Sequence, residues 1–213
     1  MKILCLSAHA DDAEIGCGGS IAKFTEEGND VYSAVFSMAE KSLPKELPKD
    51  TLLYEARASA HILGIKPQNL LTYRYPVREF PKFRQEILED LVKLNKKIQP
   101  DLVLLPSKYD FHQDHQTVTE EGFRAFRFIS ILGYEMFRNC GTFEATFFII
   151  LKKRHVQKKN DALNCYESQK LRMEQSGRKH IDQENIKALA QIRGTQIGVD
   201  YAEAFNTVRW IMG

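Results

Sequence analysis

Cysteine and long apolar runs are both scarce in this chain of 213 residues. No two cysteines form a C-x-x-C pair, and no stretch approaches the roughly 18 apolar residues that a membrane-spanning helix needs. The scattered cysteines argue against a zinc ribbon or a disulfide framework, and they suit a reducing compartment. The first apolar stretch leads directly into polar residues, unlike a secretory signal peptide. These absences predict a cytoplasmic protein without a membrane span; the cysteines are Cys5, Cys17, Cys140 and Cys165.

A strong charge of one sign and the common nucleotide and hydrolase motifs are missing as well. The net charge of +2 does not indicate a nucleic-acid partner, and we interpret the basic run over 152–159 as solvated surface. The glycines at 16, 18 and 19 do not match G-x-G-x-x-G, because Ile21 stands where the third glycine would be. The motifs H-E-x-x-H and G-x-S-x-G and a Walker lysine are absent, so zincin, serine hydrolase and P-loop interpretations lack support.

The chain does contain short apolar runs that alternate with helix-like stretches. Such an alternation predicts an α/β fold with a mostly parallel sheet and helices on both faces. The length suits one domain spanning residues 1–213. We expect strands over 3–8, 31–37, 70–75, 102–105, 146–151 and 207–212, and helices over 14–28, 52–63, 83–98, 115–128, 160–173 and 183–193.

Two clusters of histidine and aspartate follow apolar runs, at the expected carboxyl ends of strands. Ligands bind at this edge of an open α/β sheet. Histidine and carboxylate groups from both clusters could therefore bind one divalent ion and leave acid and base groups to spare. The clusters are His9-Ala10-Asp11-Asp12 and His112-Gln113-Asp114-His115.

The spacing within the clusters suggests which residues bind the metal ion and which transfer protons. His9 and Asp12 lie three residues apart on a strand-to-helix turn, and His115 could complete a three-ligand site from the second cluster. Asp11 and His112 then remain for proton transfer, and Asp114 remains to orient a histidine. The alternative is that Asp11 or Asp12 only caps the following helix.

The first cluster, with Glu14-Ile15-Gly16 and Gly18-Gly19, resembles the AHPDD…GG signature of the PIG-L/LmbE-like deacetylases. The second resembles that family's HxDH signature, and the segments 55–64, 166–169 and 201–205 resemble its second helix, its YxSQ segment and its YAExF segment. The resemblance implies a Rossmann-like fold and metal-dependent hydrolysis of N-acetyl groups. It implies zinc ligands at His9, Asp12 and His115, a general base at Asp11, an oxyanion-stabilising or proton-passing His112, and Asp114 as the partner of His112.

Some positions depart from the family pattern. The usual proline of the first signature is Ala10, which costs some turn rigidity but no ligand. An arginine often found three residues before the glutamate of the second helix is Leu52, and the resemblance assigns this position to substrate handling. An aspartate often found after the third strand is also missing. We expect Arg78, in the loop after that strand, to bind a carboxylate or phosphate of the substrate.

The leading functional prediction is removal of the N-acetyl group from an N-acetylglucosamine-like sugar or its conjugate, with release of acetate. One alternative is a hydrolase of another amide, such as a mycothiol- or bacillithiol-type conjugate. Another is a catalytically silent Rossmann-like binding module. The sequence leaves open whether the metal is zinc or ferrous iron, and whether the chain forms a homo-oligomer.

Overall fold

The computed structural model describes residues 1–177 and 182–212. Its centre is a seven-stranded sheet with the order β3-β2-β1-β4-β5-β7-β6. The neighbours from β3 to β5 run parallel, whereas β7 is antiparallel to both β5 and β6. The expected mostly parallel sheet is confirmed. The strands are β1 (Lys2–His9), β2 (Asp30–Ser37), β3 (Leu70–Thr72), β4 (Leu102–Pro106), β5 (Ser130–Tyr134), β6 (Phe147–Ile150) and β7 (Ala202–Arg209).

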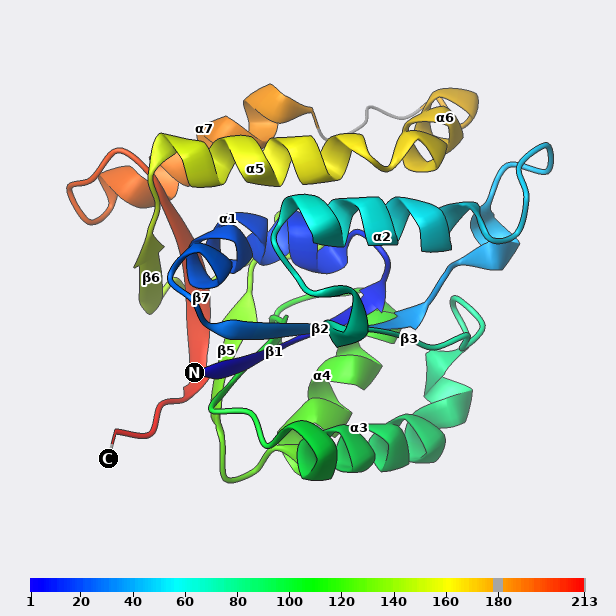
Figure 1. Ribbon diagram of the computed structural model, residues 1–213, viewed down its shortest axis with the longest axis horizontal. Coiled ribbons are helices and arrows are strands. Elements are labelled where there is room, and N and C mark those ends of the chain that lie inside the picture. Colours follow the sequence, from blue (N-terminus) through cyan, green and yellow to red (C-terminus); the bar gives the residue numbers. More distant parts are fainter. Residues whose placement is uncertain (178–181, 213) are drawn as a thin grey trace.

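Helices cover both faces of the sheet, as expected from the sequence (Figure 1). The helices α1 (Asp12–Glu26) and α2 (Thr51–Ile62) lie on one face, and α5 (Lys153–Asn164) packs across them. The helices α6 (Glu167–Gln175) and α7 (Gln183–Thr195) lie on that same side. The helices α3 (Arg84–Ile98) and α4 (Gln113–Ala125) cover the opposite face.

Several boundaries differ from those expected. The strand β5 was missed because its sequence, SILGY, is short and contains a glycine. The final strand lies at 202–209 rather than 207–212, because residues 202–206 are buried between β5 and β6. The helix expected over 160–173 is two helices, because the chain turns at Tyr166, which is fully buried.

The glycine-rich stretch serves close packing of α1. A Cβ atom on Gly16 would lie 2.1 Å from the ring of Tyr134. The helix is kinked at Cys17, where φ is −145° and ψ is 24°. The backbone N–H groups of Gly19 and Ser20, beyond the kink, donate to the buried carboxylate of Glu203 at 3.0 and 2.6 Å. These glycines therefore have a packing role, in agreement with the absence of a dinucleotide motif.

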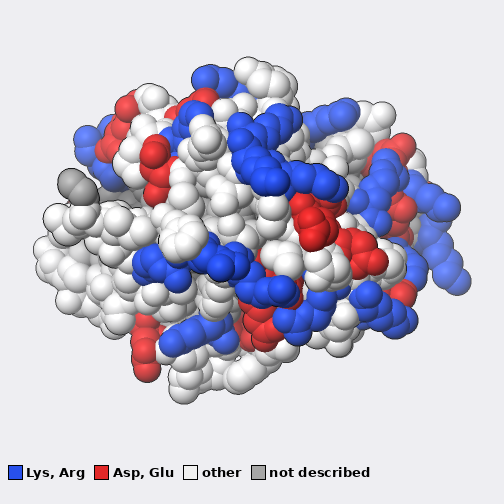
Figure 2. Space-filling view, turned by 90° about the horizontal axis from the view of Figure 1, so that it is seen from below, with Lys and Arg blue, Asp and Glu red and all other residues white. Residues whose placement is uncertain are grey.

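Charged side chains of both signs lie on the face of the molecule that carries α3 and α4. Figure 2 shows acidic side chains set among the basic ones on this face. The ion pairs there include Arg84 with Glu121 and Lys93 with Asp90.

Within residues 1–177 and 182–212, no helix combines the length and apolar character that crossing a membrane requires.

Candidate metal centre and catalytic site

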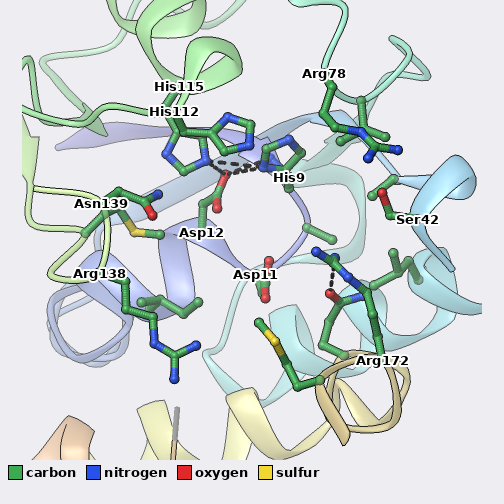
Figure 3. A pocket seen from close by; sticks show the side chains of 18 of the residues that line it. His9, Asp11, Asp12, Ser42, Arg78, His112, His115, Arg138, Asn139 and Arg172 are labelled. Carbon is green, nitrogen blue, oxygen red and sulfur yellow. Dashed lines mark hydrogen bonds and ion pairs between the residues drawn. The ribbon is translucent and has the colours of Figure 1, made fainter. Parts of the chain in front are cut away.

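The two sequence clusters meet at one edge of the sheet, as expected. His9 ends β1, Asp11 is the N-cap of α1, and Asp12 is the first residue of that helix. His112 and His115 lie at the start of α4, which follows β4. Because β1 and β4 are parallel neighbours, their carboxyl ends bring both clusters to the same place (Figure 3).

Three side-chain atoms converge tightly at this edge. The Nδ1 atom of His9 lies 3.2 Å from Nε2 of His115 and 3.5 Å from Oδ2 of Asp12, and the latter two atoms are 3.3 Å apart. Ligands bound at about 2.0–2.1 Å to a tetrahedral ion lie about 3.3–3.4 Å from one another. The donor types and their separations therefore fit a divalent metal ion.

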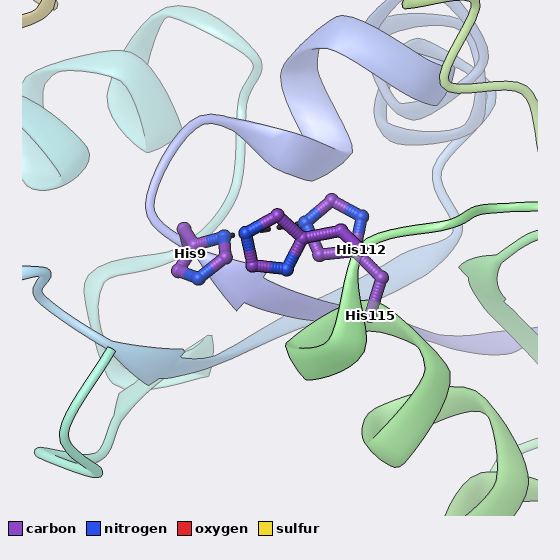
Figure 4. Close-up of side chains that lie close together, drawn as sticks. All are labelled: His9, His112 and His115. Atoms are coloured by element: carbon purple, nitrogen blue, oxygen red, sulfur yellow. Dashed lines mark hydrogen bonds between the residues drawn. The ribbon is translucent and has the colours of Figure 1, made fainter. Parts of the chain in front are cut away.

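A second, looser grouping includes His112. One ring nitrogen from each of His9, His112 and His115 lies within 4.8 Å of the others (Figure 4). The Nδ1 atom of His112 already accepts the backbone N–H of Asp114 at 3.2 Å. Only Nε2 of His112 remains for the cavity, and the carboxylate-containing set is the more compact of the two.

Each converging histidine is held from behind by a carboxylate. Oδ2 of Asp114 lies 3.0 Å from Nε2 of His9, and Oδ2 of Asp110 lies 2.6 Å from Nδ1 of His115. Such partners fix the ring orientation and the tautomer of a metal-binding histidine. Each contact leaves the other ring nitrogen of that histidine facing Asp12.

This arrangement changes the expected role of Asp114. The family resemblance paired Asp114 with His112, but the carboxylate of Asp114 contacts His9. The hydrogen bond between Asp114 and His112 is made by the backbone N–H of Asp114. Asp110, which holds His115, was not predicted from the sequence, because only the turn between β4 and α4 brings it onto the cluster. The one signal in the sequence was its position two residues before His112.

Carboxylates dominate the electrostatics of the cluster. Burial lowers the pKa of His9, but the charges of Asp12 and Asp114 outweigh it and raise this pKa to about 9. Burial likewise opposes protonation of His115, yet Asp12 and Asp110 raise its pKa to about 10. Burial raises the pKa of Asp12, but the two histidines hold it well below its usual range. A site with such affinity for positive charge suits a divalent cation.

The pKa values of Asp11 and His112 shift in the directions opposite to those of Asp12 and of the other two histidines, so their neutral forms are favoured. Burial, and then the charge of Asp12, raise the pKa of Asp11 to about 6. Burial lowers the pKa of His112, as does the charge of His115. A neutral His112 whose Nδ1 accepts a hydrogen bond carries its proton on Nε2, which can donate into the cavity. Asp11 can gain or lose a proton near neutral pH, and His112 can donate a hydrogen bond.

A cavity of about 220 Å³ opens over these groups. It is lined by the expected His9, Asp11, Asp12, His112, His115 and Arg78. Several polar residues that complete the wall were not predicted from the sequence, because they come from the segments after β2 and β5 and from α6. The available signal was that Gln169 ends the YxSQ segment and Arg172 follows it; these wall residues are Ser42, Arg138, Asn139, Gln169 and Arg172.

The two C-terminal family segments support the site from outside. The hydroxyl of Tyr166 donates to the backbone carbonyl of Ala10 at 2.5 Å and lies 2.8 Å from Oε1 of Glu14. Burial raises the pKa of Glu14 to about 7. Oε1 of Glu203 also accepts from the ammonium of Lys159 at 2.6 Å, and this lysine is buried rather than part of a solvated basic run. The segments thus brace the strand-to-helix turn and the kink of α1.

Comparison with known proteins identifies sequence and structural relatives of the chain. A sequence model of the PIG-L family, described as GlcNAc-PI de-N-acetylase, matches residues 4–126, which include both clusters. Over 144 residues the chain is 32% identical to a diacetylchitobiose deacetylase of Thermococcus kodakarensis, covering 64% of this chain and 52% of that protein. The match therefore spans about half the length of this relative.

Two further similarities cover more of the chain. Over 171 residues it is 28% identical to the uncharacterized deacetylase YaiS of Escherichia coli K12, covering 78% of this chain and 90% of that protein. The solved N,N'-diacetylchitobiose deacetylase of Pyrococcus horikoshii, in complex with an inhibitor, has a TM-score of 0.80 at 24% identity. That superposition covers 97% of this chain and 83% of the other, and at this identity it shows a shared fold.

Proposed function

The chain belongs to the PIG-L family, and from this premise we propose that it is a metal-dependent N-deacetylase of an N-acetylglucosamine-like sugar or its conjugate. The observation that carries the proposal is the meeting of a compact His-Asp-His set with Asp11 and His112 in one cavity. A metal-dependent amide hydrolase needs a Lewis acid, a base and an oxyanion donor within reach of one carbonyl.

His9, Asp12 and His115 are the proposed metal ligands. Their donor atoms are the most closely spaced in the cluster, and carboxylates hold both histidines from behind. We assign zinc to the site, with ferrous iron as the alternative, because two imidazoles and one carboxylate suit both ions. When bound, the ion supplies Lewis acidity, which polarises a carbonyl and lets water lose a proton near neutral pH.

Asp11 acts as the base. Its carboxylate takes a proton from the water whose oxygen forms a bond to the acetyl carbon. The pKa of about 6 leaves it mostly deprotonated at neutral pH while keeping it a competent proton acceptor.

His112 stabilises the charge that develops on the acetyl oxygen. Its Nε2–H donates to that oxygen, while the backbone N–H of Asp114 holds Nδ1 as the acceptor. Asp11 then returns its proton to the nitrogen as the carbon–nitrogen bond breaks. This step yields acetic acid and an amine, and transfer of the acid's proton to the amine gives acetate and an ammonium group, so atoms and charges balance. Because burial lowers the pKa of His112, we assign the acid role to Asp11 rather than to His112.

The proposal is tested by measuring acetate release. Purified protein loaded with Zn²⁺ or Fe²⁺ is incubated with N-acetylglucosamine, its phosphates, its glycosides and N,N'-diacetylchitobiose. We expect metal-dependent acetate release from at least one compound, and loss of that activity in Asp11→Asn. A thiol-containing amide conjugate is incubated in parallel and followed by the amine that it releases, and cleavage of this conjugate alone would support the alternative hydrolase. Metal binding without release from any compound would support the silent binding module.

A further inference from the structure

Two arginines lie on the side of the cavity away from His112. Figure 3 shows Arg172 reaching from α6 towards Asp11, and Arg78 on the far side of Ser42. We propose that Arg78 and Arg172 together bind an anionic group, a carboxylate or a phosphate, carried by the N-acetylated substrate. The inference rests on the proposed deacetylase function and names the class of its substrate.

Neither arginine is held in an ion pair by the described part of the chain, although Arg172 lies near enough to Asp11 for their charges to interact. Within residues 1–177 and 182–212, no carboxylate forms an ion pair with Arg78 or Arg172. The Nη1 atom of Arg172 donates instead to the uncharged amide oxygen of Gln169 at 2.9 Å. Among the described residues, ion pairs with carboxylates are formed by other arginines, including Arg74, Arg84, Arg124, Arg154 and Arg193.

Several carboxylates near Arg78 are already engaged by other groups: Asp114 accepts the backbone N–H of Arg78 and contacts His9. Glu79, the next residue, pairs with Lys41 and Lys82. Glu40 and Asp50 stand at the two ends of the segment between β2 and α2, and both pair with Arg74. The charge of Arg78 is therefore available to an anion that enters the cavity.

The backbone of Arg78 is held in a costly conformation. Its φ of 68° lies in the left-handed region that residues other than glycine seldom adopt. The N–H of Arg78 donates to Oδ2 of Asp114 at 2.6 Å, and its carbonyl accepts from Gln113. Strain of this kind is found at ligand-binding positions, where the surrounding structure must enforce it. Because the same Asp114 oxygen contacts His9, Arg78 is held in register with the proposed metal ligands.

An arginine presents several N–H donors in a planar fork that matches carboxylate and phosphate oxygens. Two such forks without counterions favour an anionic substrate over a neutral one of the same shape. The substrate class that follows is an N-acetyl sugar bearing a carboxylate or a phosphate.

Arg172 also has a competing role that the test must separate. Burial raises the pKa of Asp11, and the charge of Arg172 opposes that rise. A residue that only tunes Asp11 would affect neutral and anionic substrates equally. A residue that binds the anion changes the ratio between the two.

The test compares methyl N-acetyl-β-glucosaminide, which is neutral, with N-acetylglucosamine 1-phosphate, N-acetylglucosamine 6-phosphate and N-acetylmuramic acid. We expect wild-type kcat/KM to favour an anionic compound. In Arg78→Gln and in Arg172→Gln, the anionic-to-neutral ratio of kcat/KM falls about tenfold or more, mainly through KM. The matched control is Arg57→Gln, an exposed arginine of α2 outside the cavity wall, which keeps the wild-type ratio. The phosphate and carboxylate arms identify the anion.

Two kinetic results would overturn the proposal. One is a wild type that prefers the neutral glycoside to all three anionic compounds. The other is an equal loss for neutral and anionic substrates in both variants, which would leave Arg172 as a positioning residue for Asp11.

Equilibrium binding by calorimetry, with the same compounds and variants, separates this inference from the proposed function. Tighter binding of an anionic compound that needs both arginines, without acetate release from any sugar, would support the anion site and contradict the deacetylase. Acetate release without anion preference in binding or turnover would contradict the anion site alone.

Discussion

At the scale of single residues, the two histidines of the second cluster have different environments. His115 is held by Asp110 and its Nε2 lies 3.3 Å from Asp12, whereas His112 only caps α4 through Nδ1. We expect His115→Ala to lose the bound ion and His112→Ala to keep about one ion per chain. Elemental analysis of dialysed protein measures this, with far-UV circular dichroism confirming that both variants fold. Loss of the ion from both variants would make His112 a ligand.

Asp11 and Asp12 are adjacent carboxylates with opposite pKa shifts, and they should respond differently to the same substitution. Asp11→Asn should retain the metal and lower kcat by about 10²–10⁴, the usual contribution of a positioned base. Asp12→Asn is the matched variant and should lose the metal. Metal content and acetate release are measured on the same samples. The reverse pattern would exchange the two roles.

At the scale of elements, the close approach of α1 to β5 depends on Gly16. A methyl group there would collide with the ring of Tyr134, whose hydroxyl is fixed to the carbonyl of Leu6 at 2.9 Å. Gly16→Ala should lower the free energy of unfolding by about 1–3 kcal/mol, the usual cost of overpacking. The control is Gly18→Ala, whose nearest neighbour is a lysine side chain at 3.1 Å. Equal urea midpoints for the two variants would show that α1 can shift away from the sheet.

At the scale of the whole molecule, metal binding should stabilise the fold in a pH-dependent way. An ion at about 100 times its dissociation constant adds about 2.7 kcal/mol, which corresponds to a rise in Tm of about 5–10 °C for a chain of this size. The raised pKa values of His9 and His115 mean that the ion must displace protons. The increment from metal should therefore be larger at pH 8 than at pH 6.

Without metal, the raised histidine pKa values make the folded chain less stable as pH rises, which is opposite to the trend of the metal increment. Raised histidine pKa values stabilise the folded chain fully below the unfolded value near 6.5, and this contribution is lost as pH rises through about 9–10. Calorimetric scans with and without Zn²⁺ at both pH values separate the two effects. His115→Ala is the control and should show little metal increment. An increment that does not change with pH would contradict the protonated histidine pair.

The sequence by itself determined the fold class, the family and the two clusters. Their signals are local: apolar runs at strand spacing, and histidine and aspartate placed directly after strand ends. Parallel pairing of β1 with β4 then brings the clusters together by a general property of such sheets. The strand β5 escaped prediction because a short buried strand with an internal glycine resembles a loop in sequence.

Only the tertiary structure decided which carboxylate contacts which histidine and which residues complete the cavity. Asp114 faces His9 rather than its sequence neighbour His112, because α4 turns its first residues towards the end of β1. Asp110 and Arg172 reach the site through a tight turn and through a distant helix, and neither spacing is visible along the chain. Hydrogen-bond direction, burial and missing counterions are properties of packed neighbours, so they arise only once the chain has folded.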